Sequence, residues 1–182
     1  MLIRPADGSD AADIEALLDA AFGGNRHTRT AARLRDWSAP LIGPSFIARD
    51  DAGLLLATVQ YWPIALCPEA AEKSASGRPV DGSALFIPLT LLGPVAVAPV
   101  ARAIGLGRRL IAASLAVADE ASVGPILLIG DVSYYGRFGF DATATGGWTL
   151  PGPVDRDRLL LRNPNGAALP AVARVNAKAH SA

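Results

Sequence analysis

The most constraining feature of the sequence is an apolar run from Leu85 to Val97, followed by a helical pattern and a second apolar run. The first run is nearly continuous, which is typical of a strand buried on both faces of a sheet. A helix is predicted from about Gly105 to Ala121, and Gly124-Pro125 ends it before a short strand, Ile126 to Ile129. Two buried strands joined through a helix predict a parallel pair with a right-handed crossover.

The N-terminal part predicts a strand and two helices. A short first strand covers Leu2 to Arg4, and Ser9 or Asp10 is expected to cap the next helix with its side-chain oxygen. Gly23-Gly24 ends that helix, and a second, more polar helix is expected from about Thr28 to Trp37. The apolar side chains of the first helix recur at helical spacing and are Ile14, Leu17, Leu18, Ala21 and Phe22.

A β-rich pattern fills the middle of the chain and returns near its end. Phe46 to Ala48 and Leu54 to Leu66 are predicted as two strands of a hairpin around a turn at Asp50 to Gly53. The polar stretch from Cys67 to Ser83 is expected to form a long exposed loop. The tail after Asn163 has no clear pattern. A short helix and two late strands are expected at Ser133–Phe138, Gly147–Leu150 and Arg158–Leu161.

Length and composition favour one α/β domain over residues 1–182. Basic and acidic residues number 17 each, so the charge gives no support to nucleic acid or an anionic membrane as main partner. The start of the chain lacks a signal-peptide pattern and no apolar run approaches the roughly 20 residues that span a bilayer, so a cytoplasmic protein is expected. The lone Cys67 excludes an intramolecular disulfide, and the distant His27 and His180 predict no metal site.

The segment between the buried strand and the helix has the composition of a phosphate-binding turn. It reads Pro99-Val100-Ala101-Arg102-Ala103-Ile104-Gly105-Leu106-Gly107-Arg108-Arg109-Leu110. Glycine lets the backbone turn sharply and approach a ligand, and a helix start concentrates unpaired N–H donors and partial positive charge. Arg102, Arg108 and Arg109 add positive charge. A ligand that carries a pyrophosphate fits this chemistry.

Two familiar phosphate loops are excluded by spacing. A Walker A loop ends in Gly-Lys-Ser/Thr, which is absent, and the dinucleotide fingerprint needs glycine or alanine where this chain has Leu110. What remains is Arg-x-x-Gly-x-Gly from Arg102 to Gly107. This pattern also fits an ordinary helix start whose glycines allow tight packing, so both interpretations stay open on these residues alone.

Several motifs in sequence order resemble the GNAT acetyltransferases. Leu92 to Pro99 resembles that family's fourth strand with its bulge, and Arg102 to Gly107 is similar to its Gln/Arg-x-x-Gly-x-Gly/Ala signature. Gly130 to Phe140 resembles the segment after strand five, which ends in Tyr-x-x-x-Gly-Phe. The opening Ile3-Arg4-Pro5-Ala6 and the first helix are also similar, so the resemblance covers roughly residues 1–62 and 85–140.

The resemblance implies a mixed, strongly twisted sheet with flanking helices, whose central parallel fourth and fifth strands splay apart to admit acetyl-coenzyme A. The backbone of Val95 and Val97 would bond the pantetheine arm like an added strand, and the amides of Ile104 to Arg109 would hold the pyrophosphate. The residues implied for the cofactor are Val95, Ala96, Val97, Arg102, Ile104, Gly105, Leu106, Gly107, Arg108 and Arg109.

Tyr135 matches the tyrosine that often donates a proton to the departing thiolate in this family. An ordinary tyrosine pKa of about 10 keeps the hydroxyl protonated at neutral pH. The same ring also fits a packing role beside Tyr134, Phe138 and Phe140. Asp131 is the nearest carboxylate in the sequence, and it fits either a general base or a helix cap.

The acceptor side is implied to be lined by the first two helices, the Gln60-Tyr61-Trp62 strand and the late strands. Trp62 and Trp148 fit either flanks of an acceptor or core residues. His27, beside Arg26 and Arg29, fits either a contact to an anionic acceptor or a solvated helix surface. The resemblance also implies that homodimers are common in this class of protein.

The function implied is direct transfer of an acetyl group from acetyl-coenzyme A to a primary amine of a small molecule or peptide. No acyl-enzyme is expected, because the lone cysteine lies outside the motifs and no Ser/His/Asp set is present. Two alternatives stay open. One is an acyltransferase with another acyl group or an oxygen acceptor. The other is a non-catalytic acyl-coenzyme A-binding or regulatory module, which the departures from the family pattern at Val100-Ala101 and Ala103-Ile104 favour and Tyr135 does not.

Overall fold

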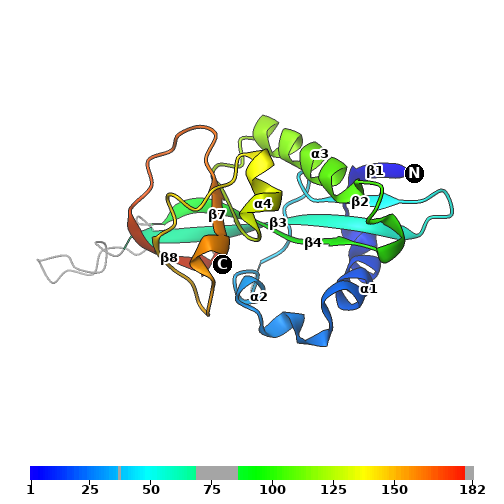
Figure 1. Cartoon of the computed structure of the whole chain (residues 1–182), viewed down its shortest axis with the longest axis horizontal. Helices are drawn as coiled ribbons and strands as arrows, with labels where there is room; N and C mark the ends of the chain where they lie inside the picture. Colours follow the sequence, from blue (N-terminus) through cyan, green and yellow to red (C-terminus); the bar gives the residue numbers. More distant parts are fainter. Residues whose placement is uncertain (37, 69–85, 179–182) are drawn as a thin grey trace, which may run out of the picture. The chain divides into compact units, whose positions relative to one another are not determined.

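The computed structural model describes residues 1–36, 38–68 and 86–178, which belong to two compact units (Figure 1). Strands β3 (Leu55–Pro68) and β4 (Ile87–Val97) contribute residues to both. The expectation of one domain over residues 1–182 stays a prediction. Unit 1 comprises Met1–Arg29, Ala39–Trp62 and Leu92–Val123, and unit 2 comprises Thr30–Ser38, Pro63–Leu91 and Gly124–Ala182.

Unit 1 is built on antiparallel strands. β1 (Leu2–Pro5) pairs with β2 (Phe46–Arg49), which pairs in turn with the first part of β3. The Ala98 N–H donates to the Leu56 carbonyl at 2.8 Å, so the end of β4 runs beside the start of β3. The hairpin predicted from the sequence is confirmed, and its turn is closed by the Asp50 carboxylate, which accepts the N–H of Leu54 at 2.8 Å.

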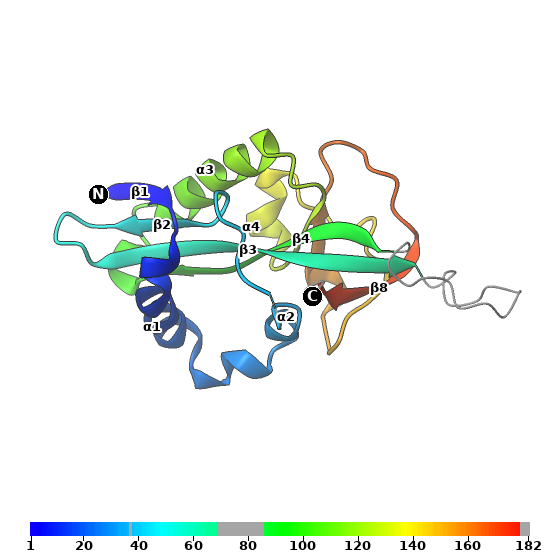
Figure 2. The same ribbon diagram turned by 180° about the vertical axis from the view of Figure 1, so that it is seen from behind.

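Two helices lie on opposite faces of these strands, α1 (Ala11–Phe22) on one and α3 (Leu106–Glu120) on the other (Figures 1 and 2). Gly23 ends α1 as predicted, with φ of 77° and its N–H donated to the Asp19 carbonyl. The predicted apolar face of α1 is also confirmed. The core beneath it consists of Ile14, Leu18, Ile47, Leu55 and Ala96, with Ala6, Leu17, Ala21 and Phe22 packed against it.

The buried face of α3 contains a polar contact that fixes how the helix lies. The Tyr61 hydroxyl and the Ser114 hydroxyl are 2.9 Å apart and both side chains are fully buried. Burying such groups is tolerated because they satisfy each other. The hydrogen bond places Ser114 toward the sheet, between apolar residues of the same helix. The other buried residues of α3 are Leu106, Leu110, Ile111, Leu115 and Ala118.

The start of α1 differs from the prediction. Asp10 occupies the N-cap position but makes no capping bond with its side chain, and Asp7 caps the preceding 3₁₀ turn instead. The Asp10 carboxylate is buried, where it accepts two hydrogen bonds from Arg4, both at 2.8 Å, and one from Arg49 at 2.9 Å. A buried charge needs such partners, so Asp10 joins β1, α1 and β2.

Unit 2 contains the parallel strand pair predicted from the sequence. The first part of β4 pairs in parallel with β5 (Ile126–Ile129), where Thr90 lies opposite Ile126 and Leu91 opposite Leu127. β5 pairs on its other side with β7 (Leu159–Arg162), which is antiparallel. With β6 (Gly147–Thr149) parallel to β8, the sheet is mixed, as predicted. The splaying of β4 from β5 and the strong twist of the sheet stay predictions.

The strand β8 (Val172–Ala177) was not predicted. It pairs in antiparallel fashion with the last part of β3, from Ile64 to Pro68. Cys67 and Pro68 therefore belong to a paired strand and not to a loop, because residues distant in sequence complete the ladder. The remainder of the expected loop, residues 69–83, lies outside the described residues.

The second helix is shorter than predicted. α2 spans only Thr30–Arg33, after a 3₁₀ turn at Gly24–Thr28. The helix starts late because Arg29 is extended, with φ of −73° and ψ of 151°. In the turn before it, the buried Arg26 guanidinium pairs with Asp19 at 2.7 Å and also with Glu15. Trp37, the predicted last residue of the helix, lies outside the described residues.

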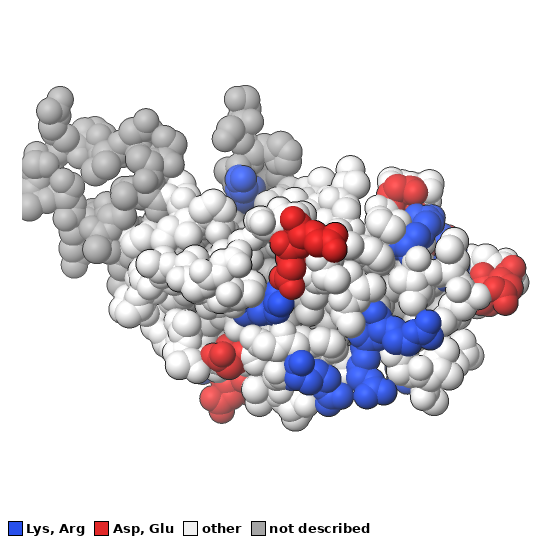
Figure 3. Space-filling view, turned by 90° about the horizontal axis from the view of Figure 1, so that it is seen from above, with Lys and Arg blue, Asp and Glu red and all other residues white. Residues whose placement is uncertain are grey.

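The surface carries both signs of charge, with much uncharged area on the face in Figure 3. In the part of the chain that the structure describes, no helix is long and apolar enough to cross a membrane. The same part holds no group of three or more metal-binding side chains of the His, Cys, Asp and Glu types. A cytoplasmic location stays a prediction.

Replacing Asp10 by asparagine should lower the free energy of unfolding by about 3 kcal/mol at neutral pH, because two arginines lose their buried counter-charge. Burial raises the pKa of Asp10, but hydrogen bonds from Arg4, the Asp7 backbone and Arg49 hold it below the ordinary value of 3.8. The stability that this shift supplies is present above the unfolded-state pKa and is lost as pH falls through the lower folded-state pKa. Chemical unfolding at a series of pH values should show the difference between the proteins shrink below about pH 4.

Asp13 provides the matched control, because its carboxylate contacts the same Arg49 at 2.7 Å but is 55% exposed. Asp13→Asn should cost about 1 kcal/mol or less, as exposed pairs usually do. Equal losses in the two variants would contradict the structural role given to Asp10.

Candidate active site

The free edge of β4 in unit 1 is defined by the alternation of the strand. Ala98 directs its N–H toward β3, so by the two-residue repeat the N–H groups of Val95 and Val97 point to the opposite edge. The Val97 carbonyl follows the same rule, because it accepts the Arg102 Nε–H at 3.3 Å. This edge can pair with an extended ligand through the N–H groups of Val95 and Val97.

Ala96 behaves differently from its two neighbours. Its side chain is buried in the core under α1, and the alternation turns its backbone groups toward β3. Of the three strand residues predicted to meet the cofactor, only Val95 and Val97 present backbone N–H groups to the free edge.

The turn that follows β4 leaves a run of backbone donors without acceptors. Within the described residues, none of the N–H groups from Ala103 to Arg108 makes a hydrogen bond of normal length and angle, and no side chain caps α3. The Arg109 N–H differs, because it donates to the Gly105 carbonyl at 3.2 Å as part of the helix. The amides available to an anion are therefore those up to Arg108, one residue fewer than predicted.

Gly105 allows this geometry. It lies in the left-handed region with φ of 69°, which residues with a side chain rarely adopt. A Cβ atom there would lie 3.2 Å from a terminal nitrogen of Arg108. The Arg108 guanidinium thus folds back over the turn and adds its charge where the free N–H groups gather. Such a concentration of donors and positive charge favours a phosphate group.

The outer side of the turn is more apolar than a phosphate site requires. Val100 and Ile104 are 80% and 58% exposed, whereas Ala101 and Leu106 are buried beneath them. Three of the side chains that depart from the family pattern, those of Val100, Ala103 and Ile104, therefore face solvent, whereas Ala101 is buried.

Tyr135 lies in unit 2, at the end of the short helix α4 (Val132–Tyr135). Its N–H donates to the Asp131 carbonyl at 2.9 Å, and its ring lies over Gly130. A Cβ atom on Gly130 would be only 2.4 Å from the Tyr135 Cε2 atom. Glycine at this position is therefore required for the ring to lie where it does, and the sequence motif gave no sign of this contact.

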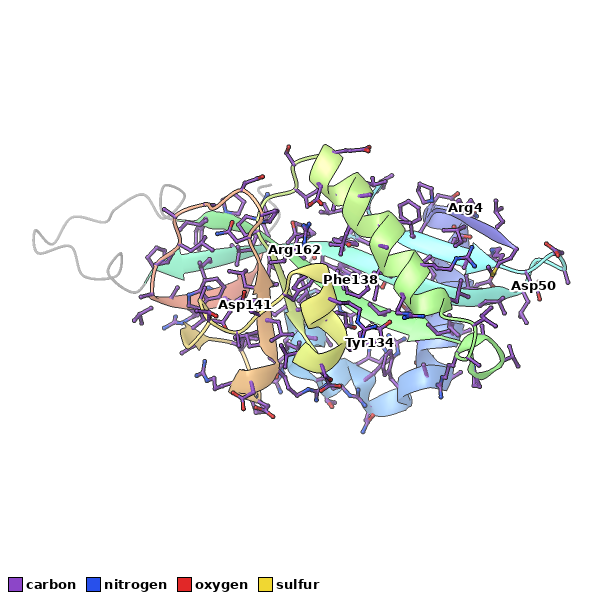
Figure 4. The ribbon with its side chains drawn as sticks, turned by 45° about the horizontal axis from the view of Figure 1, so that its top comes forward. Arg4, Asp50, Tyr134, Phe138, Asp141 and Arg162 are labelled. Atoms are coloured by element: carbon purple, nitrogen blue, oxygen red, sulfur yellow. The ribbon has the colours of Figure 1, made fainter. Side chains whose placement is uncertain are left out.

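The Tyr135 ring packs on one side against Tyr134 and on another against Phe140, with ring centres 4.9 and 6.2 Å apart. Figure 4 shows Tyr134 on α4 and Phe138 on the turn after it. The predicted aromatic cluster is confirmed. Within the described chain the Tyr135 hydroxyl makes no hydrogen bond, so a ligand can take one.

The surroundings of Tyr135 make its hydroxyl a weaker acid than usual. Burial is the main reason that its pKa rises to about 12, and the negative charges of Tyr134 and Asp131 act in the same direction, against Arg158. The hydroxyl is therefore fully protonated at neutral pH. Such a group donates a hydrogen bond and does not act as a base.

Asp131 does not cap α4 with its side chain. Its carboxylate pairs with Arg158, at 3.1 Å, and both groups are exposed. The helix-cap interpretation of this side chain is wrong, because an arginine from a late turn provides a stronger partner than the helix amides. Nothing in the sequence singled out Arg158.

The candidate acceptor residues differ in exposure. Trp148 is fully buried, and its indole N–H donates to the Pro170 carbonyl at 2.9 Å, so it is a core residue. His27 is exposed, whereas its neighbour Arg26 is occupied by α1 carboxylates. Gln60 is buried in β3 and its Oε1 atom has no hydrogen-bond partner in the described structure.

No family model matches the chain. Comparisons with individual proteins and solved structures find acetyltransferases. An uncharacterized N-acetyltransferase from Escherichia coli K12, YhbS, is 28% identical over 144 residues, which are 79% of this chain and 75% of the relative. The crystal structure of YhbS in complex with CoA superposes with a TM-score of 0.70 at 22% identity, over 97% of this chain and 89% of that one.

A second solved structure, a GNAT family acetyltransferase from Brucella melitensis in complex with acetyl-CoA, has a TM-score of 0.63 at 25% identity. It covers 97% of this chain and 95% of its own. Together with the mixed sheet described above, these likenesses show that the chain has the GNAT fold and is similar to GNAT family N-acetyltransferases.

Replacing Gly130 by alanine should displace the Tyr135 ring, because the added methyl group overlaps it. We expect a loss of about 1–3 kcal/mol in the free energy of unfolding, as in other overpacked sites. The displaced hydroxyl should titrate nearer the ordinary value of about 10 than the value of about 12 that burial gives it. Spectrophotometric titration of the phenols measures this change.

Gly136→Ala is the control, since a Cβ atom there meets only Val132 at 3.8 Å, an ordinary contact. It should leave the high-pH titration unchanged. If Gly130→Ala also leaves the titration and the stability unchanged, the close packing of Tyr135 on Gly130 is wrong.

Proposed function

We propose that the protein is an N-acetyltransferase that transfers the acetyl group of acetyl-coenzyme A directly to a primary amine. The observation that carries this proposal is the run of unpaired N–H groups from Ala103 to Arg108, at the start of α3 and directly after β4. Relatives of the same fold were solved with CoA and acetyl-CoA, which supports the same ligand here.

The residues of unit 1 fit the donor in two parts. The pyrophosphate would be held by the free amides of Ile104 to Arg108, with the Arg108 and Arg102 guanidinium groups beside them. The amide groups of the pantetheine arm would bond the N–H groups of Val95 and Val97, as a further strand does. Ala96 would contribute no side-chain contact, because its side chain lies in the core.

The reaction needs a neutral amine, a polarised thioester and a way to stabilise the departing sulfur. The amine nitrogen attacks the acetyl carbonyl carbon, the C–S bond breaks, and the amine loses its proton to water. The Tyr135 hydroxyl would donate a hydrogen bond to the sulfur as negative charge develops on the sulfur. Since a thiol has a pKa of about 8.5 and Tyr135 one of about 12, the main contribution is a hydrogen bond to the thiolate.

The experiment is a calorimetric titration of the protein with acetyl-coenzyme A, together with assays of thiol release in the presence of primary amines. The wild type should bind acetyl-coenzyme A selectively over NAD and ATP. Tyr135→Phe should bind it equally well but release thiol about 100-fold more slowly, the usual scale for losing one hydrogen bond to a developing negative charge. Because Tyr135 titrates at about 12, its deprotonation should cause no loss of wild-type turnover below about pH 11.

Tyr134→Phe is the control, since Tyr134 contacts the same ring, and it should retain turnover within a few-fold. Unchanged turnover in Tyr135→Phe at every pH would contradict the role of the hydroxyl. Binding of acetyl-coenzyme A without thiol release in the wild type would favour a non-catalytic binding module. No binding by the folded protein would contradict the proposal as a whole.

A further inference from the structure

The one buried side-chain oxygen in unit 1 that lacks a partner among the described residues belongs to Gln60. The residue is only 5% exposed, and its Oε1 atom is shielded from solvent without a hydrogen bond. Leaving a buried carbonyl unsatisfied destabilises the folded state, so such an atom calls for an explanation. Thr58, two residues earlier and also fully buried, is satisfied, because its hydroxyl donates to the Phe46 carbonyl at 3.4 Å.

The strand alternation fixes which face Gln60 occupies. Thr58 lies opposite Ile47, and Ile47 packs in the core under α1. Gln60 is two residues further along β3, so its side chain emerges on the same face. Tyr61, the next residue along β3, points to the opposite face, where its hydroxyl contacts the Ser114 hydroxyl of α3.

The register of the strands brings Gln60 close to the irregular part of β4. Ala98 bonds Leu56, and counting four residues along each antiparallel strand places Gln60 beside Pro94. The preceding residue, Gly93, has φ of 134°, and a Cβ atom built on it meets nothing within 4 Å. The β4 backbone is therefore irregular beside Gln60.

The charged groups on α1 limit which class of ligand this face can bind. The carboxylates of α1 are already engaged: Asp13 pairs with Arg49, and Glu15 and Asp19 pair with Arg26. Gln60 itself is neutral and offers a carbonyl oxygen, which accepts an N–H. This chemistry suits a ligand with a single amino group better than a polyamine, which would need several negative partners.

We infer that Gln60 is a specificity-determining residue for the acceptor, whose amino group donates a hydrogen bond to the Gln60 Oε1 atom. This inference rests on the proposed acetyl transfer and adds the acceptor class, a monoamine. The bond forms with the bound amine before the attack, and Gln60 neither gains nor loses a proton. It orients the nitrogen and supplies the partner that the buried oxygen lacks in the free protein.

The test compares Gln60→Met with the wild type, because methionine keeps the length of the side chain and removes its hydrogen-bonding groups. Thiol release from acetyl-coenzyme A is measured with butylamine, benzylamine and alaninamide as monoamines and with spermidine as a polyamine. The wild type should acetylate at least one monoamine in preference to spermidine. Gln60→Met should raise the KM for that amine about tenfold or more and leave acetyl-coenzyme A affinity unchanged.

Thermal unfolding separates this role from a structural one. Since the oxygen has no partner in the free protein, Gln60→Met should unfold at the same temperature as the wild type or higher. Thr58→Val is the matched control, because it removes a satisfied buried hydroxyl on the same face. It should unfold at a lower temperature with an unchanged KM for the amine.

Three results would overturn the inference. A large drop in the unfolding temperature of Gln60→Met would mean that the oxygen is satisfied within the protein, for example by a buried water. An unchanged KM for the amine would mean that the acceptor does not contact it, and a preference for spermidine would contradict the monoamine class. Failure of acetyl-coenzyme A to bind the wild type would instead defeat the proposed function.

Discussion

The start of α3 combines three constraints that the account of this protein depends on. β4 ends at Val97, the chain turns through Gly105 with a positive φ, and the helix begins without a side-chain cap. A helix start normally satisfies its first amides with a capping residue or with solvent. Here the N–H groups from Ala103 to Arg108 stay unpaired within the described residues, and the Arg108 guanidinium lies over the turn.

The surrounding structure of unit 1 holds this turn in place. The buried Tyr61–Ser114 hydrogen bond fixes the rotation of α3 on the sheet, and Arg102 attaches the turn to the last residue of β4. In the same unit, the Asp10 ion pairs with Arg4 and Arg49 join the first strand, the first helix and the hairpin. Local order at the turn thus follows from contacts made by residues far from it in sequence.

Unit 2 is organised around a different kind of contact. The Tyr135 ring rests on Gly130, where the absence of a side chain leaves room for the ring. Burial of the ring raises the pKa of its hydroxyl. The exposed Asp131–Arg158 pair flanks it. A hydroxyl that stays protonated, has no partner in the described chain and is held by close packing is suited to donate one hydrogen bond to a developing thiolate.

Much of this fold follows from the sequence, and the residues that escaped prediction share a cause. The apolar run before Val97, the crossover helix and the strand Ile126–Ile129 were confirmed because burial on both faces leaves a pattern that is local in sequence. β8 was missed because its pairing with β3 depends on residues about a hundred positions away. The burial of Ser114 was not predicted either, because it depends on a hydrogen bond to Tyr61, which is distant in sequence.

The residues of the candidate site also divide into those indicated by local sequence and those placed by tertiary contacts. The glycine turn and Tyr135 were found through motif order, which reflects local geometry. The side-chain environments of Asp10, Asp131 and Gln60 were not, because each depends on a partner, or on the lack of one, that only the folded chain defines. Polar side chains in this chain are placed by tertiary contacts more than by their neighbours in sequence.

Amide hydrogen exchange with and without coenzyme A reports on the individual backbone N–H groups that are proposed to hold the ligand. We expect slower exchange on binding at Val95, Val97 and from Ile104 to Arg108, with β1 and β2 unchanged. Binding that leaves the exchange of residues 104–108 unaltered, or that protects another part of unit 1 instead, would contradict this expectation.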